Sequence, residues 1–528
     1  MATVQPQRVR AGRSVELGLL ALALLIGIAA YALVGLGAKG RMPANVLGYG
    51  IGMAVLALGM HVVLRWRAPF ADPVILPVAV ALNGIGLAMI YRIDLAREVR
   101  GVHSSFATRQ LGWTAISVTL AALALVLLRD HRTLRKYTYT AMVAGLVLIV
   151  LPIVPGLGKP INGAQIWVQV LGFTLQPAEI AKLLLAIFFA GYLVTNRDTL
   201  TLAGPKVLGL QLPRIRDLGP IIVAWAVSLA VLVFERDLGT SLLFFGLFVA
   251  MLYLATERTS WVVIGLVMFA GGAALAASAF SHVGARFTVW QHALDNDVFN
   301  RAVGGSGQLV RGLYGLASGG LFGTGWGQGR PDLVPYAESD FIVASLGEEL
   351  GLTGLIVILL CYLVLAERGM RTAIGVRDGF GKLLAGGLAF VVAFQCFVVV
   401  GGITRLIPLT GLTTPFLAYG GSSLLANWII VALLLRISDD SRRPAGSPVA
   451  GPPQPTSTAP IPVRMSSGTS SVLPHRPVPG DSAPTSIVRP DGDASDGDQP
   501  GRVLGMDDLI DLGDDQPTER LTDMGDLT

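Results

Sequence analysis

The sequence is poor in charge and almost free of cysteine. Of its 528 residues only 14% are Asp, Glu, Lys or Arg, whereas 52% are hydrophobic and the mean hydropathy is +0.62. A soluble globular protein carries about 25% charged residues, so this chain has too little polar surface for water. Its two cysteines, Cys361 and Cys396, lie in apolar stretches, which excludes a disulfide framework and indicates packed thiols. The six histidines are scattered without ligand spacing, which argues against a built-in zinc site.

The chain has long apolar runs instead. A helix needs ~20 apolar residues to cross a hydrocarbon core of ~30 Å. About twelve stretches meet this requirement, at residues 15–38, 46–65, 73–91, 110–128, 138–155, 177–195, 217–234, 239–255, 261–281, 341–366, 380–403 and 412–436. The first stretch is too long, and too closely followed by others, to be a cleaved signal peptide. The sequence therefore predicts an all-α polytopic membrane protein of about twelve transmembrane helices.

Basic residues indicate which ends of these helices face the cytoplasm. They are concentrated in the N-terminal arm and in alternate loops, including residues 129–136, 197–216 and 368–377. Because cytoplasmic loops carry an excess of Lys and Arg, we expect both termini in the cytoplasm. Arginines on the outer side, among them Arg109 and Arg330, suggest an anion such as a diphosphate headgroup. Each of them could instead pair with a local acid or a lipid phosphate.

Composition divides the chain into three regions. Residues 1–72 hold a short arm and two apolar stretches, and residues 73–436 hold the other ten stretches with a large extracytoplasmic loop at 282–340. Residues 437–528 are rich in Pro, Ser and Asp. Such a segment cannot bury enough apolar surface to fold, so we expect a disordered cytoplasmic tail.

The large outer loop ends at Asp340, where it meets an apolar stretch. A charged group at this boundary has two interpretations. An aspartate just before Phe341 is a natural helix N-cap, and a carboxylate at the rim of a membrane protein is also a candidate catalyst. Spacing alone leaves both open. The same loop carries a glycine-rich run at residues 319–329, which lets the backbone approach a ligand closely but lacks the preceding strand and spacing of a dinucleotide-binding motif.

Three more charged residues lie at or inside the apolar stretches. Glu179 and Lys182 are three residues apart in a predicted helix, a spacing at which they can pair with each other. Asp237 lies in a short turn between two stretches. An intramembrane charge costs ~2.5–3.5 kcal/mol on insertion scales, so such groups face a cavity or a partner. For each of them a salt bridge or a helix cap is the structural alternative to catalysis.

Five motifs in order resemble the SEDS family (RodA, FtsW and the sporulation homologue), and the RodA type most closely. They are Asn162–Trp167, Gln176–Lys182, Asp237–Ser241, Ser339–Ile342 followed by Gly347–Gly351, and Ile407–Ser423. The resemblance covers about residues 73–437. Because the family core has ten helices, it implies that the two stretches before residue 70 are an added pair. The sequence departs from the family pattern at Glu235-Arg236, in place of Gln-Pro, and at Glu338-Ser339, in place of His-Thr.

The resemblance implies a multi-pass peptidoglycan glycosyltransferase of the bacterial cytoplasmic (inner) membrane. Such an enzyme polymerises lipid II, a polyprenyl-diphosphate disaccharide–pentapeptide, on the outer face of the cytoplasmic membrane during cell elongation or division. Asp340 would be its essential carboxylate, with Glu179, Lys182 and Asp237 supporting the site. Since the donor is an α-diphosphate and the product is β-1,4 linked, one inverting displacement with one general base suffices.

The departing diphosphate also has to be stabilised by cations. The resemblance implies a divalent ion, Mg²⁺ or Mn²⁺, with Asp237 or Asp340 as candidate ligands, and no organic cofactor. Candidates for contacts with the substrate diphosphate are Arg109, Trp167, Arg330, Ser422 and Ser423. Family members work with a class B penicillin-binding protein, so a heterodimer is expected, and nucleic acid is not. Two other functions stay open, a flippase that moves lipid II across the bilayer and a non-catalytic scaffold for the penicillin-binding protein.

Overall fold

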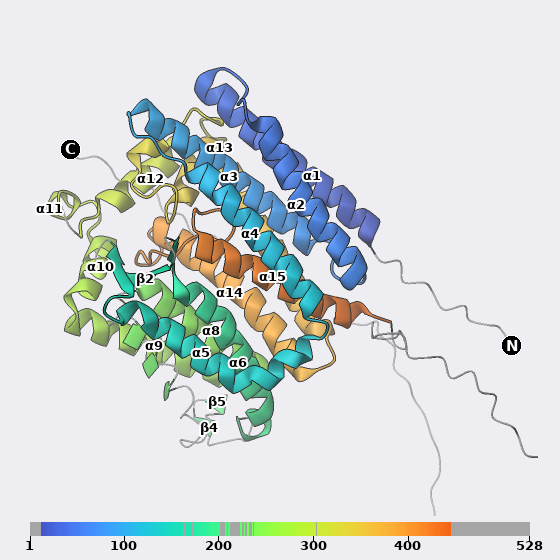
Figure 1. Ribbon diagram of the computed structural model, residues 1–528. Coiled ribbons are helices and arrows are strands. Elements are labelled where there is room, and N and C mark those ends of the chain that lie inside the picture. Colours follow the sequence, from blue (N-terminus) through green and yellow to red (C-terminus); the bar gives the residue numbers. More distant parts are fainter. Residues whose placement is uncertain are drawn as a thin grey trace, which may run out of the picture. The chain divides into compact units, whose positions relative to one another are not determined.

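The computed structural model describes most of the first 444 residues (Figure 1). The described residues are 12–161, 164–170, 173–200, 206–207, 210–211, 222–223, 226–227, 230–231, 235, 237–301 and 304–444. The predicted stretch 217–234 lies largely outside them, and so does most of the predicted tail. The predicted domain boundaries at residues 72 and 436 stay predictions.

Eleven helices among the described residues are long and apolar enough to cross a membrane. They are α1 (Arg13–Lys39), α2 (Val46–Arg67), α3 (Ile75–Val99), α4 (Phe106–Leu127), α5 (Thr138–Val150, with 3-10 turns at both ends), α6 (Pro177–Leu200), α8 (Leu238–Thr256), α9 (Thr259–Ala279), α13 (Ile342–Gly375), α14 (Gly379–Ile403) and α15 (Gly421–Arg442). Each overlaps one of the predicted stretches. The predicted polytopic helical membrane protein is therefore confirmed.

The start of the last helix was predicted wrongly. The apolar run from residue 412 suggested a helix there, but α15 begins only at Gly421. Pro415 has no N–H for a helical hydrogen bond, and Phe416 has a φ of 63°, which a right-handed helix does not accommodate. The segment 404–420 is consequently a loop that folds back over the helix ends.

A small antiparallel sheet was also not predicted. Strands β1 (Gly158–Ile161), β2 (Ala164–Val170) and β3 (Phe173–Leu175) pair in that order between α5 and α6. Residues 165–170 read Gln-Ile-Trp-Val-Gln-Val, which is rich in the β-branched and aromatic residues that favour strands. Length and hydropathy detect spans of ~20 residues, and so they miss a sheet of this size.

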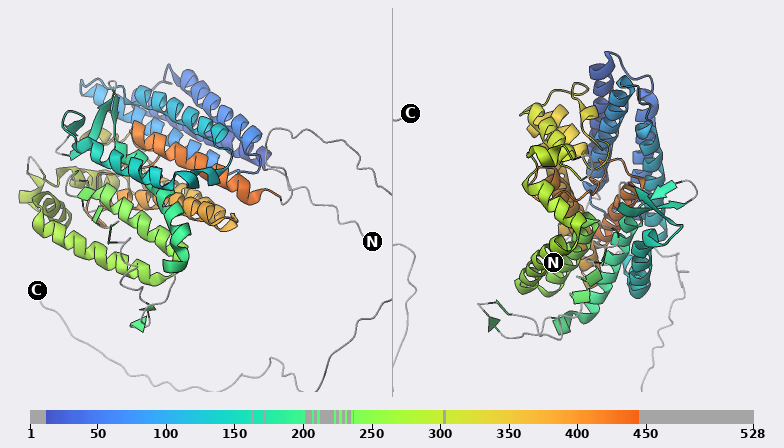
Figure 2. Two further views of the ribbon diagram at one scale, coloured as in Figure 1. Left: turned by 60° about the horizontal axis from the view of Figure 1, so that its bottom comes forward. Right: turned by 90° about the vertical axis from the view of Figure 1, so that its left-hand side faces the viewer.

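The two N-terminal helices pack on the core at one edge of the bundle, where Figures 1 and 2 show them in blue beside α3 and α4. Helix α1 crosses α3 at a pair of glycines, and a Cβ atom on Gly84 would lie only 3.0 Å from the Cα of Gly27. Small residues at a crossing let two membrane helices approach closely. The Tyr49 hydroxyl of α2 donates a hydrogen bond to the Gly84 carbonyl (3.3 Å) and closes this corner.

The large loop between α9 and α13 is ordered by short helices and by backbone contacts. It contains α10 (Ser281–Gln291), α11 (Asn296–Phe299), α12 (Gly307–Gly319) and a 3-10 turn, Pro331–Leu333. The glycine-rich run packs against α13 where that helix kinks at Gly351 (φ 68°), and Leu352 N–H donates to Gly320 O (3.0 Å). Any side chain at Gly323 would collide with the backbone of Glu349. These glycines therefore serve helix packing in the described structure.

Candidate active site

Asp340 does not cap the helix that follows it. Helix α13 begins at Ile342, its N-cap position is Phe341, and no side chain bonds to the N–H groups of its first turn. The half-buried Asp340 carboxylate instead accepts a hydrogen bond from the Ser339 hydroxyl (2.5 Å). The capping interpretation is therefore wrong for this residue, and its carboxylate is left for another role.

The capping role belongs to Asp237, at the start of α8. Its Oδ1 accepts from the Thr240 N–H (3.0 Å) and its Oδ2 accepts from the Thr240 hydroxyl (2.5 Å). The side chain is buried, and burial raises the pKa of Asp237 despite these two hydrogen bonds. Asp237 is thus a rigidly held carboxylate at the same end of the bundle as Asp340.

Arg286 of α10 links the two aspartates electrostatically. Its positive charge lowers the pKa of both Asp237 and Asp340, opposing the effect of burial. The guanidinium is half-buried and donates to the carbonyl of Leu409 in the 404–420 loop (2.8 Å). Arg286 was not among the predicted site residues, because only its place among the outer arginines marked it in the sequence.

The Asp340 carboxyl has a pKa suited to proton transfer. Burial raises it to about 6, the negative charge of Glu338 adds to this, and Ser339 and Arg286 act in the opposite direction. At neutral pH the group is ionised but more basic than an ordinary aspartate, whose pKa is about 3.9. A carboxylate tuned in this way can accept a proton from an alcohol as the alcohol attacks.

Glu235 adds a third acidic group near Asp237. It is almost fully buried, and burial together with the charge of Asp237 raises its pKa to about 9. Its Oε2 has no hydrogen-bond partner among the described residues. A buried acceptor without a partner is costly, so this corner of the site favours a proton or a cation.

The predicted pairing of Glu179 with Lys182 is confirmed. Both side chains are buried in α6, and the Lys182 ammonium donates to Glu179 and to Oε1 of Gln395 on α14 (2.9 Å). The Gln395 amide donates to the Thr413 carbonyl (2.9 Å), and the Thr413 hydroxyl lies 3.5 Å from Glu179. This network ties α6, α14 and the 404–420 loop together, and Lys182, only 1% exposed, is enclosed by it.

Two predicted contact residues, Ser422 and Ser423, lie at the start of α15. The Ser422 hydroxyl accepts from the backbone N–H of Gln176 (2.9 Å) and thereby joins the starts of α15 and α6. The Ser423 hydroxyl accepts from the Asn427 side chain one turn along α15 (3.2 Å). Both serines are buried in the described structure.

The other predicted contact residues are more open. Arg109 is exposed on the first turn of α4, Trp167 is half-buried on β2, and the exposed Arg330 pairs with Asp332 (3.3 Å). Among the described residues, neither Arg109 nor Trp167 forms a hydrogen bond or ion pair with Asp237 or Asp340. The structure therefore brings Asp340 and Asp237 under the influence of the same arginine, Arg286. Within the part of the chain that the structure describes, Arg109 and Trp167 are not bonded to either aspartate, and Arg330 pairs with Asp332 instead.

Several other arginines at this end of the bundle have structural partners. Arg92 donates to Glu349 (2.7 Å), whose carboxylate also accepts from two backbone N–H groups of the glycine-rich run. Arg97 pairs with Glu338 (2.7 Å) and Arg100 with Asp332 (2.6 Å). Pairing with local acids was the alternative to anion binding, and for these three arginines it is what the structure shows.

One group of possible metal ligands occurs at the opposite end of the helices. His131, Asp378 and Asp440 have ligand atoms within 4.8 Å of one another. Arg132 forms ion pairs with both of these aspartates, at 3.4 and 3.1 Å. Its charge compensates the two carboxylates, so the group is an ion-paired cluster that joins helix ends far from Asp340.

Comparison with known proteins gives close relatives. The peptidoglycan glycosyltransferase RodA of Mycobacterium leprae is 46% identical over 455 residues, which is 85% of this chain and 94% of the relative. RodA of Mycobacterium tuberculosis H37Rv is 48% identical over 434 residues, 82% and 92% of the two chains. Stage V sporulation protein E of Bacillus subtilis is 33% identical over 380 residues, 70% and 98%.

Solved structures share the fold. A chain of a peptidoglycan synthase complex, studied for the coordination of polymerization and crosslinking, has a TM-score of 0.54 at 21% identity and covers 71% of this chain and 99% of its own. The rod shape determining protein RodA of Thermus thermophilus has a TM-score of 0.50 at 22% identity, with 72% and 100% covered. Residues 73–443 match the cell cycle protein family of FtsW, RodA and SpoVE. The chain belongs to this family, and it is a multi-pass helical membrane protein.

Proposed function

We propose that this chain is a peptidoglycan glycosyltransferase that polymerises lipid II and that Asp340 is its general base. The observation that carries the proposal is the state of Asp340, which is free of a capping role, half-buried and basic enough to take a proton at neutral pH. The names of the RodA relatives support the reaction. Their greater identity, compared with 30–32% for FtsW proteins, supports a role in elongation.

The reaction requires one displacement. The oxygen of the acceptor 4-hydroxyl attacks the anomeric carbon of the donor while Asp340 takes the proton of that hydroxyl. The diphosphate leaves from the opposite face of the anomeric carbon. The α-linked donor is thereby converted into a β-linked product, and no covalent sugar–enzyme intermediate is needed. Arg286, which acts on both aspartates, is placed to hold an oxygen of the departing diphosphate.

Two acidic residues just before α8 fit a divalent cation. Asp237 and Glu235 offer carboxylate oxygens, the hard ligands that Mg²⁺ and Mn²⁺ prefer, and Glu235 has a buried oxygen without a partner. These two residues would hold the ion. Bound there, a divalent ion would supply positive charge for the leaving diphosphate.

The site requires the Asp340 end of the bundle to face the outside of the cell. The excess of Lys and Arg in the loops at the other end supports this orientation, with both termini in the cytoplasm. The fold shared with a chain of a peptidoglycan synthase complex supports a transpeptidase partner of the class B penicillin-binding protein type.

Purified full-length protein offered lipid II and Mn²⁺ in detergent tests the proposal. We expect a ladder of glycan polymers on a gel, absent without the protein. Translocation of the lipid II headgroup in liposomes without any ladder would instead establish the flippase. If neither activity is detected, even with the transpeptidase partner present, the non-catalytic scaffold is the remaining function. Depletion in cells should give short round cells, as loss of elongation does, whereas long filaments would point to division.

Activity should fall as the pH is lowered through about 6. A general base works only when deprotonated, so the rate should follow the ionised fraction of Asp340, whose pKa is about 6. At pH 5 about a tenth of the plateau rate should remain, because each pH unit below the pKa reduces the ionised fraction about tenfold. Initial rates of polymerisation between pH 5 and 8.5 measure this, and a rate independent of pH in this range would contradict the assignment.

Replacing Arg286 by Gln should lower the rate and move the pH profile upward. The arginine stabilises the ionised form of Asp340, so its loss raises the pKa of that carboxyl further. It also removes a cation from the proposed diphosphate site, where a loss of about tenfold or more is expected. Arg311→Gln, on α12 of the same loop, is the matched control. An unchanged midpoint of the Arg286→Gln profile would show that the two groups do not interact.

A further inference from the structure

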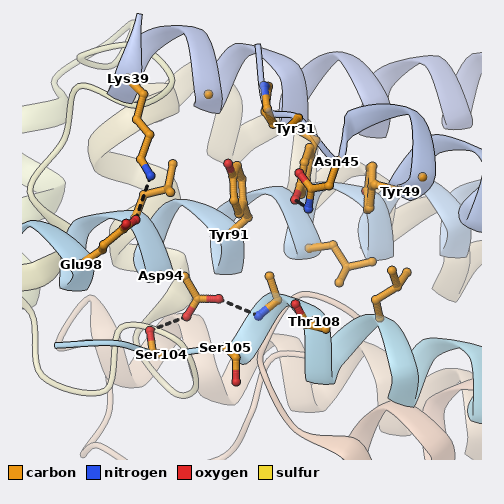
Figure 3. A pocket seen from close by; sticks show the side chains of 18 of the residues that line it. Tyr31, Lys39, Asn45, Tyr49, Tyr91, Asp94, Glu98, Ser104, Ser105 and Thr108 are labelled. Atoms are coloured by element: carbon orange, nitrogen blue, oxygen red, sulfur yellow. Dashed lines mark hydrogen bonds and ion pairs between the residues drawn. The ribbon is translucent and has the colours of Figure 1, made fainter. Parts of the chain in front are cut away.

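A cavity of about 750 Å³ lies between the N-terminal helix pair and the core, and Asp340 is not among the residues that line it. Its walls come from the ends of α1 and α3, the starts of α2 and α4, and the two loops that join them (Figure 3). We propose that this cavity binds the phosphate headgroup of a lipid. Residues before 73 lie outside the segment that matches the family, so the added helix pair supplies half of this site.

One wall is a rigid stack of three tyrosines. The rings of Tyr31 and Tyr49 are 4.2 Å apart at 14°, and those of Tyr31 and Tyr91 are 4.3 Å apart at 16°. Asn45 donates to the Tyr31 hydroxyl (2.8 Å), and the Tyr49 hydroxyl donates to Gly84 O. This wall is formed before any ligand arrives, which lowers the entropy lost on binding. Tyrosine is also enriched where lipid headgroups meet the hydrocarbon core.

The cavity lining carries two cations, Lys39 and Arg41, and two carboxylates, Asp94 and Glu98, and three of these four side chains have partners among the described residues. The Asp94 carboxylate is occupied, since it accepts from the Ser104 hydroxyl (2.5 Å) and from the N–H groups of Phe106 and Ala107. Lys39 pairs with Glu98 at the exposed rim (2.8 Å).

Arg41 is exposed and forms no ion pair or side-chain hydrogen bond with the described residues. The first turn of α2 beside it has no side-chain cap, and the Asn45 side chain at the N-cap position donates to the Tyr31 hydroxyl. A free guanidinium next to uncapped N–H groups favours an oxyanion such as phosphate.

Apolar side chains also line the cavity. Leu87 and Leu111 are among them. The flanking helix α2 exposes Leu47 and Ile51, at 75% and 65%, as a helix in contact with lipid does. A soluble anion would gain nothing from this apolar part, whereas a lipid has a chain to place there. The combination of an unpaired cation with apolar walls therefore selects an amphiphile with a phosphate head, and two kinds of lipid carry that chemistry, an anionic phospholipid and a polyprenyl phosphate.

Native mass spectrometry of the purified full chain tests this proposal. The probes are phosphatidylglycerol, polyprenyl phosphate and zwitterionic phosphatidylcholine, each titrated in detergent. We expect one of the two anionic lipids to bind at least tenfold more tightly than phosphatidylcholine. The anionic lipid that binds more tightly identifies which of the two classes occupies the cavity. Equal binding of phosphatidylcholine, or binding of glycerol phosphate as tight as that of any lipid, would overturn the proposal.

Three variants place the binding in this cavity. Lys39→Ala combined with Arg41→Ala should weaken the anionic lipid about tenfold or more, through lost charge-assisted hydrogen bonds. Thr108→Trp should weaken it by filling the cavity, while Arg65→Ala, at the other end of α2, should change nothing. Thermal unfolding confirms that each variant is folded, and wild-type binding by both cavity variants would overturn the proposal. Asp340→Asn should bind lipid as the wild type does, so this proposal and the proposed function can fail independently.

Discussion

Replacing Asp340 by Asn is expected to reduce the polymerisation rate by about 10²–10⁴-fold, the contribution of a general base. Asparagine keeps the size and the hydrogen bond with Ser339 but cannot accept a proton. Because Asp340 caps no helix, the change removes the chemistry without removing a structural contact. The measurement is the initial rate of glycan synthesis from lipid II by the purified protein.

The same substitution should not destabilise the protein, and at pH 8 it should stabilise it. The pKa of Asp340 is about 6 in the folded protein and about 3.9 when unfolded, so the folded state binds the proton more tightly. Such a group favours folding most at low pH, and this contribution is lost as the pH rises through about 6. Above that pH the buried charge opposes folding, and the neutral amide removes this effect. Melting temperatures of wild type and variant at pH 5 and pH 8 should therefore diverge as the pH rises.

Asp295→Asn provides the matched control, since Asp295 is an exposed acid in the same loop that pairs only with His292 (3.0 Å) among the described residues. It should leave both rate and stability unchanged. If Asp340→Asn were inactive because it melts early or is degraded, Asp340 would have a structural role. A rate close to that of the wild type would remove it from the mechanism altogether.

Asp340 and Asp237 show what the sequence could not decide. Each precedes an apolar helix, and either one could be a cap. Whether each aspartate caps the helix that follows it depends on the residue at which that helix starts. α8 starts directly after Asp237, with Thr240 as its hydrogen-bond partner, whereas Phe341 separates Asp340 from the start of α13. A difference of one residue is within the uncertainty of any helix boundary predicted from sequence.

Local interactions were predicted better than long-range ones. The spacing of Glu179 and Lys182 on one helix was sufficient to predict their pairing. Arg286 is brought to Asp340 by α10, and its guanidinium contacts Leu409, which is far away in the sequence. No periodic pattern encodes such a contact. The helices followed from apolar runs for the same local reason, whereas the three-stranded sheet and the late start of α15 did not.

Replacing Lys182 by Met is expected to destabilise the protein by about 3–5 kcal/mol, the cost of breaking a buried ion pair from one side. Glu179 would keep its charge in a buried site, where the Thr413 hydroxyl, at 3.5 Å, is its one remaining hydrogen-bond partner among the described residues. The melting temperature in detergent should fall accordingly. Lys382→Met is the matched control, because Lys382 forms an exposed pair with Glu257 (3.5 Å) that is worth ~0–1 kcal/mol.

The double variant Glu179→Gln with Lys182→Met separates positioning from catalysis. It removes both charges, so most of the lost stability should return. We expect polymerisation to recover with it, because Lys182 is enclosed by Glu179 and Gln395 and acts by holding α6 against α14 and the 404–420 loop. A double variant that is as stable as the wild type but as inactive as Lys182→Met would show that the Lys182 ammonium takes part in the reaction directly. The ammonium would then have to leave its buried partners and bind the diphosphate directly, which requires this network to open during the reaction.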